Sequence, residues 1–202
     1  MNRRRMLLAA PALLLATAVP AFAEPLSLNA ISAYLNTIKS AGADFTQIND
    51  DGTISVGKIL IKRPGRIRFE YAPPEDLLVM AGASTVGIFD GRSNTGKPEQ
   101  YPLKRTPLSI ILERNVNLAR RNMVTGHTFD GTATTVRAQD PEHPEYGHIE
   151  LKFTDNPVEL RQWIITDGAG IQTTVVLGKL ANGINLPPNL FSIQAETAKR
   201  GG

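Results

Sequence analysis

The strongest constraint on the fold of this chain is a two-residue alternation of apolar and polar side chains. In RIRFEY, residues 66–71, the three apolar residues fall on one side of an extended chain and the three charged residues on the other. Similar runs recur along the sequence and are separated by turn residues, such as the Asp-Gly pair at 51–52. This pattern predicts one long antiparallel sheet of about ten strands, which is long enough to curl.

Two segments have helical spacing instead. In the first, apolar residues recur at steps of three and four: Leu28, Ile31, Tyr34, Leu35 and Ile38. Ser27 or Asn29 is expected to cap this helix and Gly42 to end it. A shorter helix is expected to start at Thr106-Pro107, with the threonine as its N-cap. Both helices are amphipathic, so we expect them to cover the concave face of the sheet and enclose an apolar space.

Two further segments carry weaker signals. Residues 92–105 are polar and predict an irregular loop. INLPPNLFSI, residues 184–193, predicts one last short apolar strand, and the residues after it predict a frayed basic tail.

The first 23 residues have the organisation of a secretory signal peptide. Three arginines, Arg3 to Arg5, precede an apolar run that is too short for a stable membrane-spanning helix, and the segment ends in Ala-Phe-Ala. We expect cleavage after Ala23, a single domain over residues 24–202, and a periplasmic location. The arginine cluster fits both the general export pathway and twin-arginine export, and both lead to the same compartment.

Composition excludes several classes of function. The signal segment holds three of the 22 basic residues, so 19 basic residues face 19 acidic ones in the rest of the chain. This balance gives no reason to expect a nucleic-acid partner. The chain has no cysteine, which excludes disulfides, a thiol nucleophile, a thiolate metal site and a lipid anchor on an N-terminal cysteine.

The candidate catalytic groups do not form a recognisable site. His127 and His148 fall in predicted strands, and His143 lies in a predicted loop near Glu142 and Glu145. There is no pair of histidines at metal-binding spacing, no nucleophile elbow and no glycine-rich phosphate loop. Paired carboxylates lie at predicted turns, where they are turn formers. We therefore expect no enzymatic activity, no metal and no cofactor.

The basic segment 62–71 poses a question that alternation leaves open. Arg63 shares one side of its strand with Ile59 and Ile61, but both sides of that strand carry apolar residues, so parity does not identify the interior. If the isoleucine side is the inner one, Arg63 needs partners, and carbonyls at the end of a covering helix would suit its fork of donors. The alternative is an exposed arginine at the end of a strand. Arg66 and Arg68 are predicted to face water.

Four stretches together resemble the LolA family of periplasmic lipoprotein carriers, in the form found in alphaproteobacteria. They are AISAYLNTIKSAGADFTQ, GKILIKRPGRIRFEYAPP, LRQWIITDGAGIQTTVVLGKL and LPPNLFSI, and the similarity runs in order over residues 28–193. The resemblance implies a mainly β, α+β fold: a curled, incomplete antiparallel β-barrel of about 10–11 strands, with helices as a lid over an apolar cavity. It also implies a monomer without a cofactor. The arginine of the family's KRP motif bonds the lid, and this role falls on Arg63.

The resemblance also implies a function. The family accepts acylated lipoproteins from the inner-membrane ABC transporter LolCDE and delivers them to the outer-membrane receptor LolB. We expect the cavity wall and lid to include Ile59, Ile61, Ile67, Phe69, Tyr71, Leu108, Ile111, Leu112 and Trp163, with ordinary core packing as the alternative for each. The alternative function is a periplasmic lipid-binding or lipoprotein-sensing regulator of the same fold.

Overall fold

The computed structural model describes residues 24–93, 97–119 and 122–201. The predicted signal segment 1–23 and its cleavage site lie outside the described residues on the N-terminal side. The strands are β1 (Ser40–Ile48), β2 (Ile54–Lys62), β3 (Arg66–Tyr71), β4 (Leu77–Gly82), β5 (Thr85–Asp90), β6 (Glu99–Pro102), β7 (Val124–Phe129), β8 (Ala133–Gln139), β9 (His148–Thr154), β10 (Glu159–Thr166), β11 (Gln172–Leu177) and β12 (Ala181–Asn182). The α-helices are α1 (Leu28–Thr37), α2 (Ser109–Leu112) and α3 (Ile193–Arg200), and the 3-10 turns are η1 (Leu103–Arg105), η2 (Pro144–Tyr146) and η3 (Pro188–Phe191).

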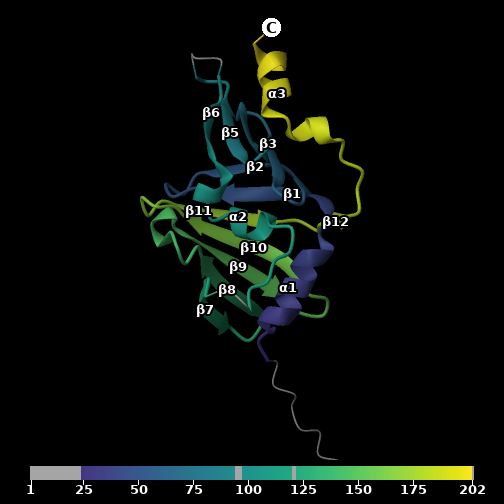
Figure 1. Ribbon diagram of the computed structural model, residues 1–202, viewed down its shortest axis with the longest axis vertical. Helices are drawn as coiled ribbons and strands as arrows, with labels where there is room; N and C mark the ends of the chain where they lie inside the picture. Colours follow the sequence, from purple (N-terminus) through teal and green to yellow (C-terminus); the bar gives the residue numbers. More distant parts are fainter. Residues whose placement is uncertain (1–23, 94–96, 120–121, 202) are drawn as a thin grey trace, which may run out of the picture.

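All strands belong to one antiparallel sheet that remains open. Its order is β6-β5-β4-β3-β2-β1-β11-β10-β9-β8-β7, with β12 beside β1. The end strands β6 and β7 do not pair with each other, so the barrel is incomplete, as predicted (Figure 1). The twelve strands exceed the predicted 10–11 because β6 and β12 are too short to show alternation. In particular, β6 and η1 lie in the segment 92–105 that was predicted to be irregular.

The sheet curls strongly about its inner face. Phe69 on β3 and Trp163 on β10 are four strands apart in the sheet order. In a flat sheet they would be about 19 Å apart, at about 4.8 Å per strand. Their ring centroids are 6.2 Å apart, so the two halves of the sheet must fold toward each other.

Helices α1 and α2 cover this inner face. Ile31 and Leu35 of α1, and Ile111 of α2, belong to the same hydrophobic cluster as Phe69 and Trp163. In Figure 1, α1 lies along the half of the sheet that contains β8 to β10, and α2 lies near the centre. None of the described helices is long and apolar enough to cross a membrane.

The helix ends differ in part from prediction. Ser27 caps α1 by accepting a 3.1 Å hydrogen bond from the amide of Ala30, as expected. Gly42 does not end this helix, because β1 has already begun at residue 40. Its lack of a side chain instead allows close packing, since a Cβ there would lie 2.9 Å from the side chain of Ile184. Thr106 is not the N-cap of α2; its hydroxyl donates to the carbonyl of Leu103.

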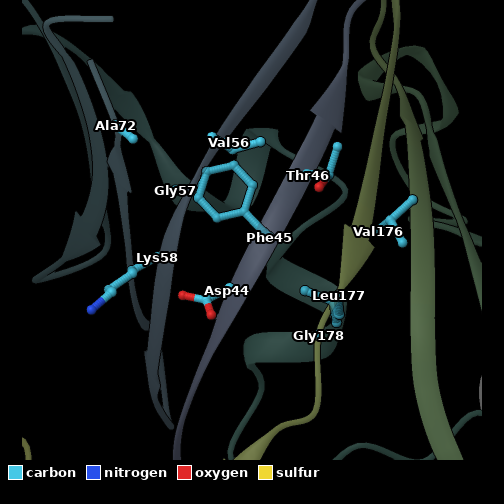
Figure 2. Close-up of a pocket in the computed structure, with 10 residues that line it drawn as sticks. All are labelled: Asp44, Phe45, Thr46, Val56, Gly57, Lys58, Ala72, Val176, Leu177 and Gly178. Atoms are coloured by element: carbon cyan, nitrogen blue, oxygen red, sulfur yellow. The ribbon is translucent and has the colours of Figure 1, made fainter. Parts of the chain in front are cut away.

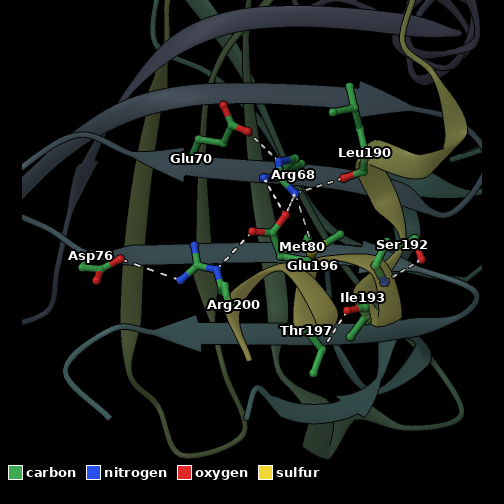
Figure 3. Close-up of polar contacts among 11 residues, drawn as sticks. Arg68, Glu70, Asp76, Met80, Leu190, Ser192, Ile193, Glu196, Thr197 and Arg200 are labelled. Carbon is green, nitrogen blue, oxygen red and sulfur yellow. Dashed lines mark hydrogen bonds and ion pairs between the residues drawn. The ribbon is translucent and has the colours of Figure 1, made fainter. Parts of the chain in front are cut away.

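The C-terminal segment corrects two predictions. Residues 184–193 do not form a strand, and the predicted frayed tail is mostly the helix α3, capped by Ser192. Leu78 and Met80 of β4 and Phe89 of β5 form a second apolar cluster with Ile193 of α3. By strand parity these side chains point to the outer face, so α3 covers the outer face of the sheet at the β3–β5 end (Figure 3).

Arg68 is buried under this helix rather than facing water. The residue is 7% exposed, and its guanidinium donates two 3.2 Å hydrogen bonds to one carboxylate oxygen of Glu196. It also donates to the carbonyl of Leu190 at 3.1 Å and to Glu70 at 2.6 Å (Figure 3). Strand parity placed Arg68 correctly on the outer face. The prediction of solvation was wrong because the chain returns to cover that face.

We predict that Glu196→Gln lowers the free energy of unfolding by about 1–3 kcal/mol at neutral pH, because the substitution leaves Arg68 buried without its main counter-charge. Burial opposes ionisation of Glu196, but Arg200 and Arg68 outweigh burial and lower its pKa. The ionised carboxylate therefore stabilises the fold above the ordinary carboxyl pKa, and this contribution is lost as the pH falls through the lowered pKa.

Urea unfolding at neutral and acidic pH measures both effects. The loss of stability in acid should be smaller in Glu196→Gln than in the wild type. Glu70→Gln is the matched control, because Glu70 also bonds Arg68 but its side chain is 43% exposed. Equal effects of the two substitutions would contradict the importance of the α3 contact.

Candidate functional site

A cavity of about 700 Å³ lies between the inner face of the sheet and the segment that leads into α2. Its apolar wall comes from β3, β4, β5, β10 and β11, and residues 105–108 cover it. The apolar lining residues are Phe69, Val79, Val86, Ile88, Pro107, Leu108, Trp163, Ile165 and Val175. This volume is within the range of small-molecule sites, about 300–1,000 Å³.

One side of the cavity is polar. It is formed by Gln47, Tyr71, Tyr101, Arg105, Thr106, Glu145, Tyr146, Asp167, Gly168 and Thr173. The guanidinium of Arg105 lies 5.7 Å from the centre of the Tyr146 ring, a cation–π contact. Burial raises the pKa of Tyr101, and the carboxylates of Glu99 and Asp167 raise it further. An amphiphile therefore finds an apolar wall and a polar rim in the same cavity.

Tyr71 joins the two sides. Its ring packs edge-on against Phe45, with centroids 5.2 Å apart, while its hydroxyl donates a 2.6 Å hydrogen bond to the side chain of Gln47. Burial raises the pKa of Tyr71 to about 12, although the bond to Gln47 opposes the shift. The phenol is therefore neutral at physiological pH and acts as a donor.

Arg63 connects the two covering helices at the edge of the site. Its Nε donates a 2.9 Å hydrogen bond to the carbonyl of Glu113, just after α2, and its terminal nitrogens bond that carbonyl and the carbonyl of Leu35 in α1. A further bond of 3.2 Å reaches the side chain of Asn36. Burial lowers the pKa of Arg63, and Glu113 opposes this shift. Carbonyls at or just after the ends of both helices thus bond one arginine.

Asn36 and a backbone contact complete this connection. The side chain of Asn36 accepts a 3.0 Å bond from the amide of Val116 and donates a 2.8 Å bond to its carbonyl. The amide of Gly65, in the β2–β3 turn, donates a 2.9 Å bond to the carbonyl of Leu112 at the end of α2. We call Arg63, Asn36 and Gly65 with these partners the lid joint. These polar bonds add to the apolar packing of α1 and α2 against the sheet.

Comparison with known proteins identifies the family of this chain. Residues 36–194 match the sequence model of the family described as outer membrane lipoprotein carrier protein LolA. The chain belongs to the LolA family. An outer-membrane lipoprotein carrier protein of Cupriavidus pinatubonensis is 26% identical over 203 residues, covering 94% of this chain and 93% of the relative.

Two further matches are more distant in sequence or structure. A carrier protein of the same description from Chromobacterium violaceum is 25% identical over 191 residues, covering 90% of this chain and 91% of the relative. A crystal structure of a LolA superfamily protein from Nitrosomonas europaea superposes with a TM-score of 0.45 at 10% identity, covering 83% of this chain and 98% of that chain.

In this LolA-family chain, the residues expected at the cavity separate into two groups. Phe69, Tyr71, Leu108 and Trp163 line the cavity. The other five lie in the surrounding hydrophobic cluster but not among the lining residues: Ile59, Ile61, Ile67, Ile111 and Leu112. These five residues belong to the same hydrophobic cluster as wall residues such as Phe69 and Trp163, so they support the cavity wall without lining it.

Sequence analysis missed several lining residues. Val79 and Ile88 are cross-strand partners on β4 and β5 and share the inner face with Phe69. The alternation in these strands was a usable signal, because it places them on the same side as the aromatic wall once the register is known. Tyr101 and Arg105 had no such signal. Tyr101 lies in the short strand β6 and Arg105 in the turn η1, within a segment that has no periodicity.

The three histidines lie apart from one another, and His143 is the one near the cavity. His127 is exposed and contacts the carbonyl of Leu26, and His148 lies 3.9 Å from Glu150. His143 stacks on the ring of Tyr146 near the polar rim, with its Nδ1 3.0 Å from Glu145. Within the described ranges, no group of three or more acidic or histidine side chains is arranged to hold a metal ion.

A second hollow, of about 510 Å³, lies on the outer face over β1, β2 and β11 (Figure 2). Val56 and Val176 flank Thr46 across the three strands and are 47% and 38% exposed. Figure 2 shows the ring of Phe45 against Gly57, where an added Cβ would lie 2.9 Å from the ring. This open hollow is lined by side chains of both signs and has no cover comparable to α2, so the inner cavity is the better candidate for enclosing an apolar ligand.

We predict that Tyr71→Phe lowers the free energy of unfolding by about 1 kcal/mol, because Gln47 loses its buried partner. The wild type should also contain one phenol that ionises near pH 12, well above an exposed tyrosine, and the variant should lack it. Ultraviolet difference spectroscopy over an alkaline titration checks the second outcome. If the phenol lost in Tyr71→Phe is one that ionises in the ordinary tyrosine range, the burial of Tyr71 is contradicted.

Proposed function

We propose that this protein is a periplasmic carrier that binds the acyl chains of lipoproteins released from the inner membrane and delivers them to the outer membrane. The observation that supports this most directly is the apolar inner cavity with a polar rim, which residues 105–108 cover just before α2. An acyl chain fits the apolar wall, and the lipid-linked peptide lies toward the rim. Membership of the lipoprotein carrier family points to the same cargo.

The energetics require a cover of this kind. An acyl chain of about fifteen methylene groups, at about 0.8 kcal/mol each, exposes about 12 kcal/mol of hydrophobic free energy in water. Such a chain does not cross an aqueous compartment without a carrier. The carrier must also release its cargo without nucleotide hydrolysis, so its affinity for the cargo must be moderate.

In this proposal the lid joint keeps the affinity for cargo moderate. In the proposed cycle the closed arrangement of α1 and α2 protects the inner face, and cargo favours an arrangement in which the lid bonds are broken. Each net hydrogen bond contributes only about 0.5–1.5 kcal/mol, so cargo of ordinary affinity shifts the population between the two arrangements. Arg63 is the latch in this proposal, because it bonds both helices.

The proposed partners follow from this role. The donor is an inner-membrane ABC transporter of the LolCDE type, and the acceptor is the outer-membrane receptor LolB or its equivalent. The proposal includes a signal cleaved after Ala23, one domain over residues 24–202, a monomer, and no cofactor or enzymatic activity. Acyl transfer between protein cavities needs no bond to be made or broken.

We predict that the protein purified from a periplasmic extract carries acylated lipoprotein, visible by native mass spectrometry as a mass shift that disappears when detergent strips the cargo. The apolar wall would hold the acyl chains through gentle isolation. Glycerophospholipid as the only bound species would support the lipid-binding regulator instead. A bare protein that also failed to bind a fluorescent fatty-acyl probe would contradict both.

We predict that Arg63→Leu releases a fluorescent acyl probe roughly tenfold more slowly than the wild type, because the loss of two or three net hydrogen bonds destabilises the closed, empty arrangement relative to the cargo-bound one. Stopped-flow transfer of the probe to lipid vesicles measures the rate. Arg63→Lys should be intermediate, since it keeps the charge without the fork of donors. Arg66→Leu is the matched control from the neighbouring strand and should release the probe at the wild-type rate. A wild-type rate in Arg63→Leu would exclude the latch role.

A further inference from the structure

Among the buried side chains of the described residues, the indole of Trp163 is the one with a polar atom that has no hydrogen-bond partner. Its Nε1 is inaccessible and has no hydrogen-bond acceptor among the residues that the structure describes. The residue is 0% exposed and also lines the inner cavity. Buried polar groups in folded proteins are nearly always paired, so an unpaired N–H at a cavity wall needs a physical explanation.

The neighbours of Trp163 explain why the protein itself does not satisfy it. Its cross-strand partners are Leu151 on β9 and Val175 on β11, and the ring of Phe69 packs edge-on from across the cavity. None of these side chains has an acceptor, and the backbone groups around it belong to the paired ladder of the sheet. A water molecule held there would need two to four polar partners, which this apolar wall does not offer.

We propose that the indole N–H of Trp163 donates a hydrogen bond to the carbonyl oxygen at the root of a bound acyl chain. This inference rests on the proposed carrier function and makes it more specific. The cargo then supplies what the wall lacks: a neutral acceptor attached directly to a long hydrocarbon. Ester-linked and amide-linked acyl chains both have such a carbonyl. Because the residue has no exposed surface in the closed protein, the carbonyl replaces protein contacts as the cargo spreads the cavity.

The consequence is selection for acyl chains over simple alkyl chains. Apolar contacts with the wall favour any hydrocarbon of the right length, whereas the N–H favours only a chain that brings an acceptor. A site with a buried donor discriminates against a ligand that lacks the matching group, because the donor then stays unpaired. Phenylalanine at this position would keep most of the apolar surface without the donor.

The test compares two lipids of equal chain length: 1-palmitoyl glycerol, which has an ester carbonyl, and 1-O-hexadecyl glycerol, which has an ether oxygen. Displacement of a bound fluorescent dye gives the affinity of the full mature protein for each. The wild type should prefer the ester roughly tenfold, and Trp163→Phe should lose this preference or reverse it. Val175→Ala is the matched control: it lines the same cavity and should weaken both lipids equally.

A second measurement reads the N–H directly. The chain has a single tryptophan, so an amide-type ¹H–¹⁵N spectrum shows one indole resonance. That resonance should move downfield when the ester lipid binds and much less when the ether lipid binds. This comparison uses only the wild-type protein, so it stands even where Trp163→Phe does not fold.

The outcomes separate this inference from the proposed function. Equal affinities and equal indole shifts for ester and ether would overturn the hydrogen bond while leaving the carrier function intact. Failure of both lipids to bind would count against the carrier function itself. An ester preference that persists in Trp163→Phe would assign the selection to another group, such as the Tyr71 hydroxyl, and would also overturn the inference.

Discussion

The rest of the structure depends on the curl of a sheet that does not close. Curling brings Phe69 on β3 against Trp163 on β10 and produces a deep apolar inner face, but β6 and β7 remain unpaired at the two ends. In a closed barrel the ladder itself would enclose the interior. Here separate elements must do so, and they are attached by side-chain and turn contacts rather than by a continuous ladder. The lid joint around Arg63 adds polar bonds to the apolar packing of these elements on the sheet.

At one end of the sheet the outer face is also apolar, and a separate element must cover it. β4 is apolar on both sides, so covering its inner face leaves Leu78 and Met80 facing outward. Helix α3 packs on them, and Arg68 and Glu196 fix its position with a buried ion pair. A buried pair contributes little net stability but penalises every arrangement that separates the partners. The pair therefore specifies where α3 docks, whereas the apolar cluster supplies the affinity for docking.

Alternation and turn residues were enough to predict the antiparallel sheet, and apolar spacing of three and four residues was enough to predict the helix α1, because these elements depend on local periodicity. Alternation alone says less about individual side chains. It was not enough for Arg63 and Arg68. Both are arginines near one turn, yet one bonds the lid on the inner side and the other is buried on the outer side under α3. Parity assigns a residue to a face but does not say whether a distant segment covers that face. For the same reason Phe69 lines the cavity while its neighbour on the same face, Ile67, is packed in the core. An inner-face residue lines the cavity or packs in the core according to where it lies along its strand relative to the lid. That placement depends on the tertiary structure and cannot be read from local periodicity.

Moderate binding and selective binding make different demands on such a cavity. Apolar area raises the affinity for every hydrocarbon, so a wall built for tight binding would also retain its cargo at the outer membrane. A donor that only the correct cargo satisfies raises the affinity for that cargo alone, and its unpaired state makes the closed protein less stable. The lid bonds act in the opposite direction, because they stabilise the closed protein. In the proposed cycle, the balance between the unpaired indole of Trp163 and the paired guanidinium of Arg63 would allow cargo to be recognised specifically without being held too tightly for transfer.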